Sequence, residues 1–458
     1  MCAIIIQYIM LLISCCRGKP TGRNSMIPII HYNDLTPEKL DRLYNRFGDD
    51  FSSIMINTVI PIVNDVKQKG DEAVIGYTKK FDGVTLSSIL ASEQEIETAW
   101  NNTPPHILDA FRKAQENIQE YHLHQKQDNY IYTREDGITL GMTFDAIESA
   151  GIYVPGGKAS YPSSVLMGVI PAQIAGVKNI TVITPPDKTG NIPEITLAVC
   201  RLLGVTQVLK SGGAQGIAAA GFGTKTIAKS DIIVGPGNIF VTAAKTYLFS
   251  LGVIQIDSMA GPSEVLIIAD EHANPEWVAY DLLSQAEHEE MAMAVLVTTS
   301  QSLAEKVREV INKDIEKGGG RHEIKKASLK NSGIIIVVDS MDAAIDFNNR
   351  FGPEHMEFIV ENPLEYLTRI KNVGSLFLGA YAPVAVGDYY SGTNHILPTG
   401  GAARFSSGVS VDTFMRHTSF QYLTEKSLGE ARNSVVSMAG MEGFDDMHGG
   451  SVEIRFKK

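Results

Sequence analysis

Apolar residues in the central and C-terminal parts of the chain come in short runs of strand length, with helical patterns between most of them. The first group of runs comprises residues 151–154, 179–184, 206–209, 231–234 and 253–257. The second group comprises residues 265–269, 294–299, 334–338, 357–360 and 375–379. Apolar strands that alternate with helices are typical of parallel sheets covered on both faces. The pattern therefore predicts an α/β protein with two doubly wound, Rossmann-like modules.

The N-terminal segment up to about residue 150 has a mostly helical pattern. Thr36 before Pro37 is typical of a helix cap with proline at the first helical position, and Gly48 is the expected end of that helix. A second helix is indicated by apolar residues spaced by three and four, namely Ile107, Phe111, Ala114, Ile118 and Tyr121. The pattern becomes helical again after about residue 410, which predicts a small C-terminal helical tail.

These patterns predict four parts. Residues 26–151 together with 263–409 form a larger α/β domain, and residues 152–262 form a second α/β domain. Residues 410–458 form the C-terminal tail, and residues 1–25 are a leader of doubtful status.

The first 16 residues are nearly all apolar, and three interpretations compete for them. A signal peptide needs a basic start, and no Lys or Arg precedes Arg17. The sequence LISC at residues 12–15 is similar to a lipoprotein processing box, again without the basic start. A misassigned start codon is the third interpretation, because Met26 opens a sequence typical of a soluble protein. We favour the third and leave residues 1–25 out of the fold prediction.

Glycines gather just after the predicted strands, at residues 154–157, 211–216, 235–238 and 260–264. Ligands of parallel α/β sheets bind at the carboxyl ends of strands, where small residues let the backbone come close to them. A single cluster is explained equally well by a tight turn, but four clusters at successive strand ends predict a binding site. The dinucleotide fingerprint G-x-G-x-x-G is absent from the sequence, so a standard Rossmann cofactor mode is not supported.

The composition narrows the class of protein further. The chain has 458 residues with 44% hydrophobic and 20% charged residues, which excludes disorder and indicates several domains. The 40 basic and 52 acidic residues give a formal charge of −12, which disfavours nucleic acid as a partner. Three of the four cysteines lie in the first 16 residues, and only Cys200 lies in the body of the protein. A body with one cysteine closes no internal disulfide and indicates a reducing compartment, the cytoplasm.

Two pairs of polar residues that lie close together in the sequence are candidates for chemistry. Gln285 and His288 are three residues apart in a predicted helix, so they share one face and are able to share a metal ion, although an ordinary surface helix also explains them. Glu354 and His355 are adjacent just before a predicted strand, where they can serve one reaction centre as two bases. A surface Glu–His pair without a function is the alternative interpretation of the second motif.

Residues 386–408 are rich in Gly, Ser and Thr and contain Asp388 and His395. So many turn residues around an acid and a histidine are typical of a binding loop. Near the C-terminus, Glu442 and His448 form a further candidate pair.

In this order and spacing, the motifs resemble those of the histidinol dehydrogenase family. The resemblance rests on QAEH, the PEH turn, GDYYSGTNHILPTGG and SSGVSV, and also on YVPGG, YPSSVLM, IPAQIAGV, GGAQGIAA, VGPGN and AGPSEVLIIAD. It extends from about residue 30 to the end of the chain.

The resemblance implies a zinc-dependent oxidation of an amino alcohol to an amino acid, with two NAD and one water consumed. It implies the zinc ligands Gln285, His288, Asp388 and His448, the last supplied by the partner subunit of an intertwined homodimer. Glu354 and His355 would be catalytic, His355 as the general base and Glu354 as the group that activates water. Ser263, His395 and Glu442 would hold the substrate, and Tyr153, Gln215 and Asn238 would contact NAD. No nucleic acid or membrane is expected as a partner.

Two features depart from the family pattern. Glu442 and His448 are six residues apart, where the family has five, so one residue is inserted between them and the assignment of either residue stays open. Glu289-Glu290 stands where the family often has Asp-Pro. These changes leave open a related zinc and NAD enzyme for another small polar alcohol, such as a sulfonated propanediol. A non-catalytic nucleotide-binding or membrane-tethered protein is a third hypothesis, which the presence of every candidate residue disfavours.

Overall fold

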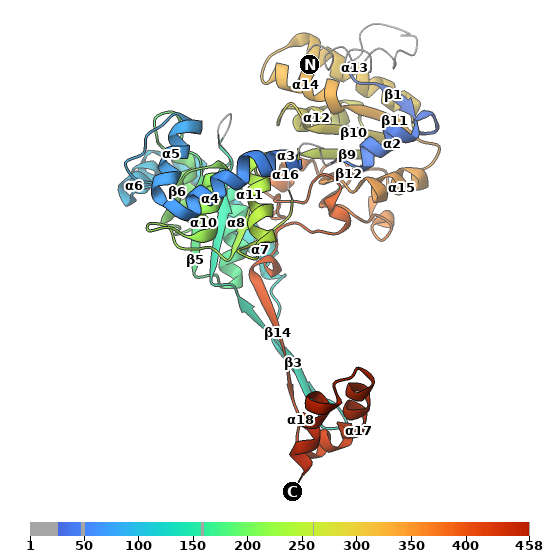
Figure 1. Cartoon of the computed structure of the whole chain (residues 1–458). Helices are drawn as coiled ribbons and strands as arrows, with labels where there is room; N and C mark the ends of the chain where they lie inside the picture. Colours follow the sequence, from blue (N-terminus) through green and yellow to red (C-terminus); the bar gives the residue numbers. More distant parts are fainter. Residues whose placement is uncertain (1–25, 47–50, 157–159, 260, 458) are drawn as a thin grey trace, which may run out of the picture. The chain divides into compact units, whose positions relative to one another are not determined.

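The computed structural model describes residues 26–46, 51–156, 160–259 and 261–457. The chain forms two compact units (Figure 1). Unit 1 contains the described residues of Met1–Phe47, Gly261–Val384 and Pro398–Ser406. Unit 2 contains those of Gly48–Ala260, Ala385–Leu397 and Ser407–Lys458. The leader 1–25 and the expected helix end at Gly48 lie outside the described residues.

Unit 1 is built on a six-stranded parallel sheet with the order β1-β11-β10-β9-β12-β13. Its strands are β1 (Ile29–His31), β9 (Glu264–Ala269), β10 (Met293–Thr298), β11 (Ile334–Val337), β12 (His355–Ile359) and β13 (Ser375–Leu378). One face packs on α12 (Pro275–Ala286), α13 (Gln301–Lys317) and α14 (His322–Ser332), and the other on α2 (Pro37–Tyr44) and α15 (Met341–Phe351). Short turns η1 (Tyr32–Asp34), η3 (Pro363–Tyr366) and η4 (Ala402–Arg404) complete the unit.

Strand β9 shows why this sheet lies at the centre of unit 1. All six of its residues are buried, and successive side chains point to opposite faces. Val265 and Ile267 join the cluster under α12, whereas Leu266 and Ile268 join the cluster under α15. A strand that is apolar on both faces is stable only between two helical layers.

Unit 2 contains a five-stranded parallel sheet with the order β6-β5-β4-β7-β8. Its strands are β4 (Ser149–Tyr153), β5 (Asn179–Thr184), β6 (Gln207–Lys210), β7 (Ile232–Val234) and β8 (Gln255–Ile256). One face packs on α6 (Glu93–Asn102), α7 (Pro105–Leu123), α8 (Pro162–Ala175) and α9 (Glu194–Leu202). The other packs on η2 (Met55–Val59), α4 (Ile60–Lys69), α5 (Asp71–Asp82), α10 (Gly213–Phe222) and α11 (Ile239–Ser250), with α3 (Phe51–Ile54) preceding η2.

Unit 2 also carries an antiparallel ribbon, with the strand order β14-β3-β2 (Figure 1). The strands are β2 (Tyr130–Thr133), β3 (Thr139–Ala146) and β14 (Met415–Tyr422). After β14 come α17 (Glu425–Met441), η6 (Asp445–Gly449), α18 (Gly450–Glu453) and η7 (Ile454–Phe456). Turn η5 (Asp412–Phe414) precedes β14, and α16 (Val384–Tyr389) joins the two units along the chain.

The ten predicted strands and the parallel α/β class are confirmed. The predicted cap is confirmed as well, because the Thr36 hydroxyl accepts the backbone N–H of Lys39 at 3.3 Å. The helical interpretation of residues 410–458 is wrong in part, since 415–422 form β14. Strands β1, β2 and β3 were likewise not predicted in the N-terminal segment. Helices α4 to α7, which the sequence patterns assign to the larger domain, pack on the sheet of unit 2.

None of the helices formed by the described residues is long and apolar enough to cross a membrane.

Candidate active site

Glu354 and His355 lie side by side at the start of β12, and both are buried. Helix α15 ends at Phe351, and Gly352 follows with φ of 61°, the left-handed conformation that turns the chain toward the strand. Strand β12 then pairs with β9 on one side and β13 on the other. The pair therefore sits at the amino end of a central strand, in a rigid part of unit 1.

The backbone of one residue, Glu264, contacts both members of this pair. The Glu264 N–H donates to Glu354 Oε2 at 2.9 Å, and the Glu264 carbonyl lies 3.3 Å from His355 Nδ1. A carbonyl only accepts hydrogen bonds, so Nδ1 carries the proton of this bond. Glu354 Oε2 lies 3.5 Å from the same nitrogen. In a neutral imidazole with a proton on Nδ1, the lone pair available for proton transfer is on Nε2.

Ser263 directly precedes β9 in unit 1, and its backbone N–H lies 3.4 Å from Glu289 Oε1. This backbone link connects the start of β9 with the turn that follows α12.

Gln285 and His288 lie at the C-terminal end of α12, as their spacing predicts. Gln285 is buried, and its Nε2 has no hydrogen-bond partner among the described residues. His288 is exposed, but partial desolvation of its ring lowers its pKa; Glu287 opposes this shift and Arg321 adds to it. A neutral imidazole beside a buried amide is the state in which both groups bind a metal ion.

The loop that contains Asp388 and His395 belongs to unit 2. Asp388 lies in α16, and burial raises its pKa to about 7. His395 Nε2 lies 3.1 Å from the Ser163 hydroxyl in the first turn of α8. The neighbouring Asn394 donates to the Met167 carbonyl at 2.7 Å. Two contacts with one helix therefore hold this part of the loop.

Tyr153, Gln215 and Asn238 follow or end strands β4, β6 and β7, so all three belong to the carboxyl edge of the unit 2 sheet. The Gly213 N–H donates to the Tyr153 hydroxyl at 3.5 Å, and a Cβ on Gly213 would lie 2.8 Å from Gln215 Oε1. Burial raises the pKa of Tyr153 to about 12, so the phenol stays neutral. Asn238 caps α11, with Oδ1 accepting the N–H groups of two following residues. Polar groups from three strand ends therefore lie along this edge.

Glu442 and His448 lie in the C-terminal helices of unit 2, and both are exposed. Glu442 ends α17, and His448 lies in the π-helical turn η6. The His448 ring lies 5.7 Å from the ring of Phe444.

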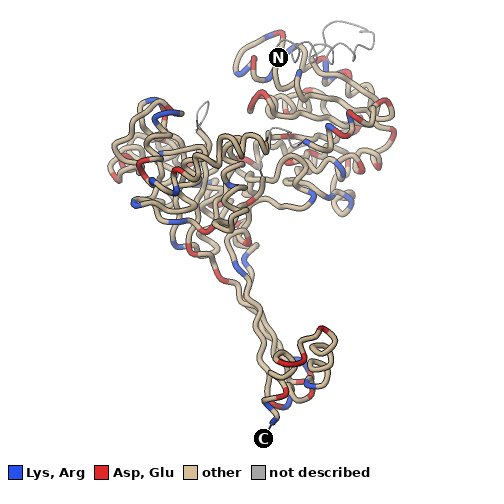
Figure 2. The backbone as a smooth tube through the Cα atoms, in the orientation of Figure 1, with Lys and Arg blue, Asp and Glu red and all other residues tan. Residues whose placement is uncertain are grey.

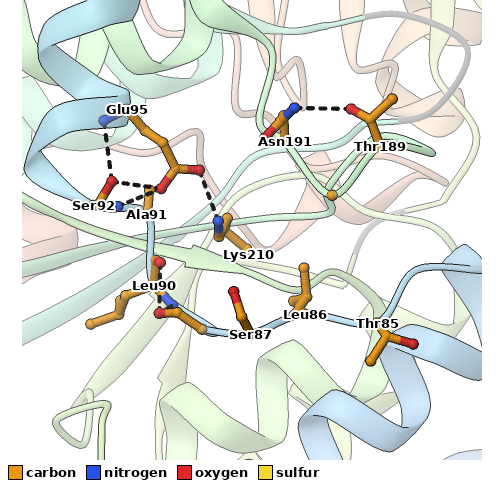
Figure 3. A pocket seen from close by; sticks show the side chains of 12 residues that line it. Thr85, Leu86, Ser87, Leu90, Ala91, Ser92, Glu95, Thr189, Asn191 and Lys210 are labelled. Atoms are coloured by element: carbon orange, nitrogen blue, oxygen red, sulfur yellow. Dashed lines mark hydrogen bonds and ion pairs between the residues drawn. The ribbon is translucent and has the colours of Figure 1, made fainter.

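A further cavity of about 690 Å³ lies in unit 2 at the carboxyl end of β6 (Figure 3). Lys210 and Glu95 point toward one another there and form an ion pair of 2.8 Å. Its wall consists largely of hydroxyl and amide side chains, including those of Ser92, Thr189 and Asn191. None of the residues expected for catalysis, substrate or cofactor lines it.

Among the residues that the structure describes, no three or more His, Cys, Asp or Glu side chains form a group that could hold a metal ion. Gln285 and His288 belong to unit 1, and Asp388 and His448 belong to unit 2.

The fold and the buried polar groups define a class of enzyme. Two parallel sheets between helical layers, glycine-rich strand ends and a buried acid–imidazole pair are typical of α/β enzymes that transfer protons. The histidinol dehydrogenase family model matches residues 46–456, so the chain belongs to that family of NAD-dependent oxidoreductases.

Relatives from several organisms are similar over nearly the whole chain. Histidinol dehydrogenase of Clostridium acetobutylicum is 48% identical over 94% of this chain and 99% of its own length. That of Methanocaldococcus jannaschii is 46% identical over 90% and 94%. The crystal structure of histidinol dehydrogenase from Elizabethkingia anophelis has a TM-score of 0.88 at 38% identity and covers 95% of this chain and 99% of that one.

Proposed function

We propose that this protein oxidises L-histidinol to L-histidine through histidinaldehyde, in the last steps of histidine biosynthesis. The observation that carries the proposal is the buried Glu354–His355 pair at the start of β12, in a chain that the family model matches over residues 46–456. When bound, NAD accepts a hydride in each of two successive oxidations, and zinc holds the imidazole and amine of the substrate.

We assign proton transfer to the two catalytic residues. His355 Nε2 takes the hydroxyl proton of the alcohol as the carbon loses hydride, because Nδ1 is engaged with the Glu264 carbonyl. The Glu354 carboxylate takes a proton from the water that adds to the aldehyde. The hydrated aldehyde presents a hydroxyl again, so His355 can act as the base in the second oxidation. A base positioned in this way contributes about 10²–10⁴-fold in rate.

The proposed metal ligands are Gln285, His288, Asp388 and, from the partner subunit, His448. This set of amide, imidazole and carboxylate donors suits zinc, a metal of borderline softness. Gln285 is buried and would bind through its amide oxygen, because the –NH2 group offers no lone pair to a metal. One Zn²⁺ per subunit is expected.

Substrate and cofactor contacts are assigned to separate groups of residues. Tyr153, Gln215 and Asn238 are proposed to contact NAD, and their place at the carboxyl edge of the unit 2 sheet is where such sheets bind ligands. Ser263, His395 and Glu442 are proposed to hold histidinol.

An obligate homodimer is part of the proposal. The antiparallel ribbon and C-terminal helices expose large apolar side chains, among them Ile131, Tyr422, Met438 and Met441, the last 89% exposed. Figure 2 shows few charges along β3 and β14, where Asp145 and Arg416 stand opposite each other in the strand register. Exposed apolar surface of this kind marks an interface with another chain.

The cytoplasm is the proposed location. Outside the first 16 residues the sequence has one cysteine, Cys200, which is a free and buried thiol, and this fits a reducing compartment.

The decisive assay measures NADH formation by the purified protein with NAD and histidinol, before and after treatment with a chelator. The proposal predicts two NADH per histidinol, loss of activity with the chelator and recovery with Zn²⁺. No NADH from histidinol, together with turnover of a sulfonated propanediol, would identify the related dehydrogenase instead.

Mixing two inactive variants tests the shared site. His288→Ala and His448→Ala lose different ligands, so hybrid dimers contain one complete site if His448 reaches the partner. We expect activity to reappear when the two variants are unfolded and refolded together. If well-folded mixed dimers recover no activity, His448 does not complete the site of the partner subunit.

A further inference from the structure

Arg46 and Glu264 form a buried ion pair in unit 1, and neither belongs to the residues discussed above as catalytic or ligand-binding. Arg46 Nε lies 2.7 Å from Glu264 Oε2, and Arg46 Nη2 donates to Glu264 Oε1 at 2.8 Å. The two side chains are only 6% and 2% exposed. The planar guanidinium thus meets the carboxylate with two nitrogens, Nη2 as the hydrogen-bond donor and Nε as a close ionic contact.

Arg46 also holds the chain segment that leads to the catalytic pair. Its Nη2 donates to the Phe351 carbonyl at 3.0 Å, and its guanidinium lies 3.8 Å from the centre of the Phe351 ring. Its Nη1 donates to the Leu43 carbonyl at 2.5 Å. Phe351 is the last residue of α15, three residues before Glu354. One guanidinium therefore links the start of β9 with the approach to β12.

Glu264 connects this ion pair to both catalytic side chains. Its side chain is fixed by Arg46 and by the Gly400 N–H, which donates to Oε1 at 3.0 Å. Its backbone N–H holds Glu354, and its backbone carbonyl holds His355. A movement of residue 264 would displace both catalytic groups together and would release the bond that keeps the proton on Nδ1 of His355.

We propose that Arg46 and Glu264 are positioning residues, which fix the main chain at residue 264 and thereby the orientation and tautomer of the His355–Glu354 pair. The proposal rests on the proposed function for the roles of that pair. In this proposal Arg46 and Glu264 act through the backbone of residue 264, which contacts Glu354 and His355.

Arg46→Lys is the most informative variant, because it keeps the charge and loses the two-point geometry. We expect kcat with histidinol to fall about 10²-fold, as small displacements of catalytic groups do. The KM for histidinol and the zinc content should stay within about twofold of wild type, because the variant leaves the ligands intact. The primary isotope effect with histidinol deuterated at the reacting carbon should increase, since the chemical step becomes slower. Glu264→Gln, whose side chain has the same shape, should likewise lower kcat and leave the KM and the zinc content within about twofold of wild type.

The control is Lys325→Met, which removes a different ion pair of unit 1. Lys325 Nζ lies 2.5 Å from Asp314 Oδ2, between α14 and α13. This variant loses stability without touching residue 264, so its kcat should equal that of wild type. A kcat of Arg46→Lys within twofold of wild type, or a loss confined to KM or zinc content, overturns the proposal. An equal loss of kcat in the control would also overturn it, because the effect would then follow from stability.

The nitrogen spectrum of the imidazole gives a readout that does not depend on turnover. In ¹⁵N-histidine-labelled enzyme at neutral pH, the His355 signals, assigned by comparison with His355→Gln, should show the proton on Nδ1. In Arg46→Lys and Glu264→Gln they should move toward a mixture of tautomers. An unchanged spectrum in both folded variants overturns the positioning role. If the wild-type enzyme does not oxidise histidinol, only the proposed function is contradicted. The nitrogen spectrum still tests whether Arg46 and Glu264 fix the tautomer of His355.

Discussion

The buried lysine Lys245 offers a sharp test of how the glycine-rich loop after β7 is held. Lys245 Nζ donates to the Gly235 carbonyl at 3.0 Å and pairs with Asp257 Oδ1. Asp257 Oδ2 in turn accepts the Gly235 N–H at 2.8 Å. Both backbone groups of Gly235 are therefore bound by one ion pair whose members are 2% and 6% exposed.

The position of Gly235 has no room for a larger side chain. Its φ is 119°, and a Cβ on it would lie 2.1 Å from the Tyr153 carbonyl oxygen. The chain can pass β4 this closely only with glycine. Asn238, proposed to contact NAD, caps α11 three residues later. The ion pair thus fixes the loop from which a cofactor contact projects.

The perturbation is Lys245→Met, which keeps the apolar stem and removes the charge. It leaves the Asp257 carboxylate buried without its partner, and breaking a buried pair in this way costs about 3–5 kcal/mol. For a unit of more than 200 residues, each kcal/mol lowers Tm by roughly 2 °C, so Tm should fall by roughly 6–10 °C. The double variant Lys245→Met/Asp257→Asn removes the lone charge as well, so its Tm should exceed that of the single variant.

Differential scanning calorimetry of wild type, both single variants and the double variant gives the complete cycle. The KM for NAD, measured in the same four proteins below their Tm, should rise in Lys245→Met. A Tm loss below 2 °C, or a double variant whose loss equals the sum of the single losses, would refute the reasoning.

Three further predictions concern other parts of the molecule. Burial and the nearby carboxyl of Asp281 raise the pKa of Glu357 well above 4.5, so the folded protein keeps a proton that the unfolded chain releases, and stability falls as pH rises above about 4.5. Glu357→Gln keeps the oxygen that accepts the Val384 N–H. Its Tm should exceed that of wild type by a margin that grows from pH 5 to pH 8. A constant margin would show that Glu357 does not retain the proton. Burial raises the pKa of the Cys200 thiol to about 12. Mass spectrometry should therefore find Cys200 unmodified by iodoacetamide in the native protein and alkylated in guanidinium. Rapid labelling of the native protein would contradict this burial. His355→Ala should lose at least about 10²-fold in kcat with unchanged zinc content, and near-normal turnover would contradict its role as base.

Central parallel strands such as β5 and β9 were predictable because they are continuous apolar runs that are mostly buried. The antiparallel ribbon was not, for a physical reason. Residues 415–422 of β14 are nearly all exposed, so no apolar face distinguishes this strand from a polar helix. Its partner β3 lies more than 260 residues earlier in the chain, and only the fold brings the two together.

The candidate site shows the same division between local and distant signals. Glu354 and His355 are adjacent, so the sequence displays them as a pair. The expectation that ligands gather at carboxyl strand ends does not lead to them, because they lie at the amino end of β12. Arg46 gave no signal, since its partner Glu264 lies 218 residues away. The acid in the run AGPSEVLIIAD was the available signal, because a glutamate that begins a buried strand requires a compensating cation.

The resemblance to the family implies one extra residue between Glu442 and His448, and the local structure can accommodate it. The Gly449 N–H donates to the Phe444 carbonyl at 3.1 Å, an i→i−5 bond of a π-helical turn. Such a turn holds one residue more than an α-helical turn, so the insertion is taken up locally. Gly449 faces α17, because a Cβ on it would lie 3.8 Å from the Ala439 Cβ.

His448→Ala should therefore lower the zinc content per dimer, measured by atomic absorption after gel filtration. A variant with Asp446 deleted should retain zinc, because the π-turn can shorten to an α-turn and leave His448 at the spacing usual in the family. Full zinc in His448→Ala, with loss of zinc in the deletion variant, would show that another residue of the turn is the ligand. The contrast between the two variants separates the identity of the ligand from the length of the turn that carries it.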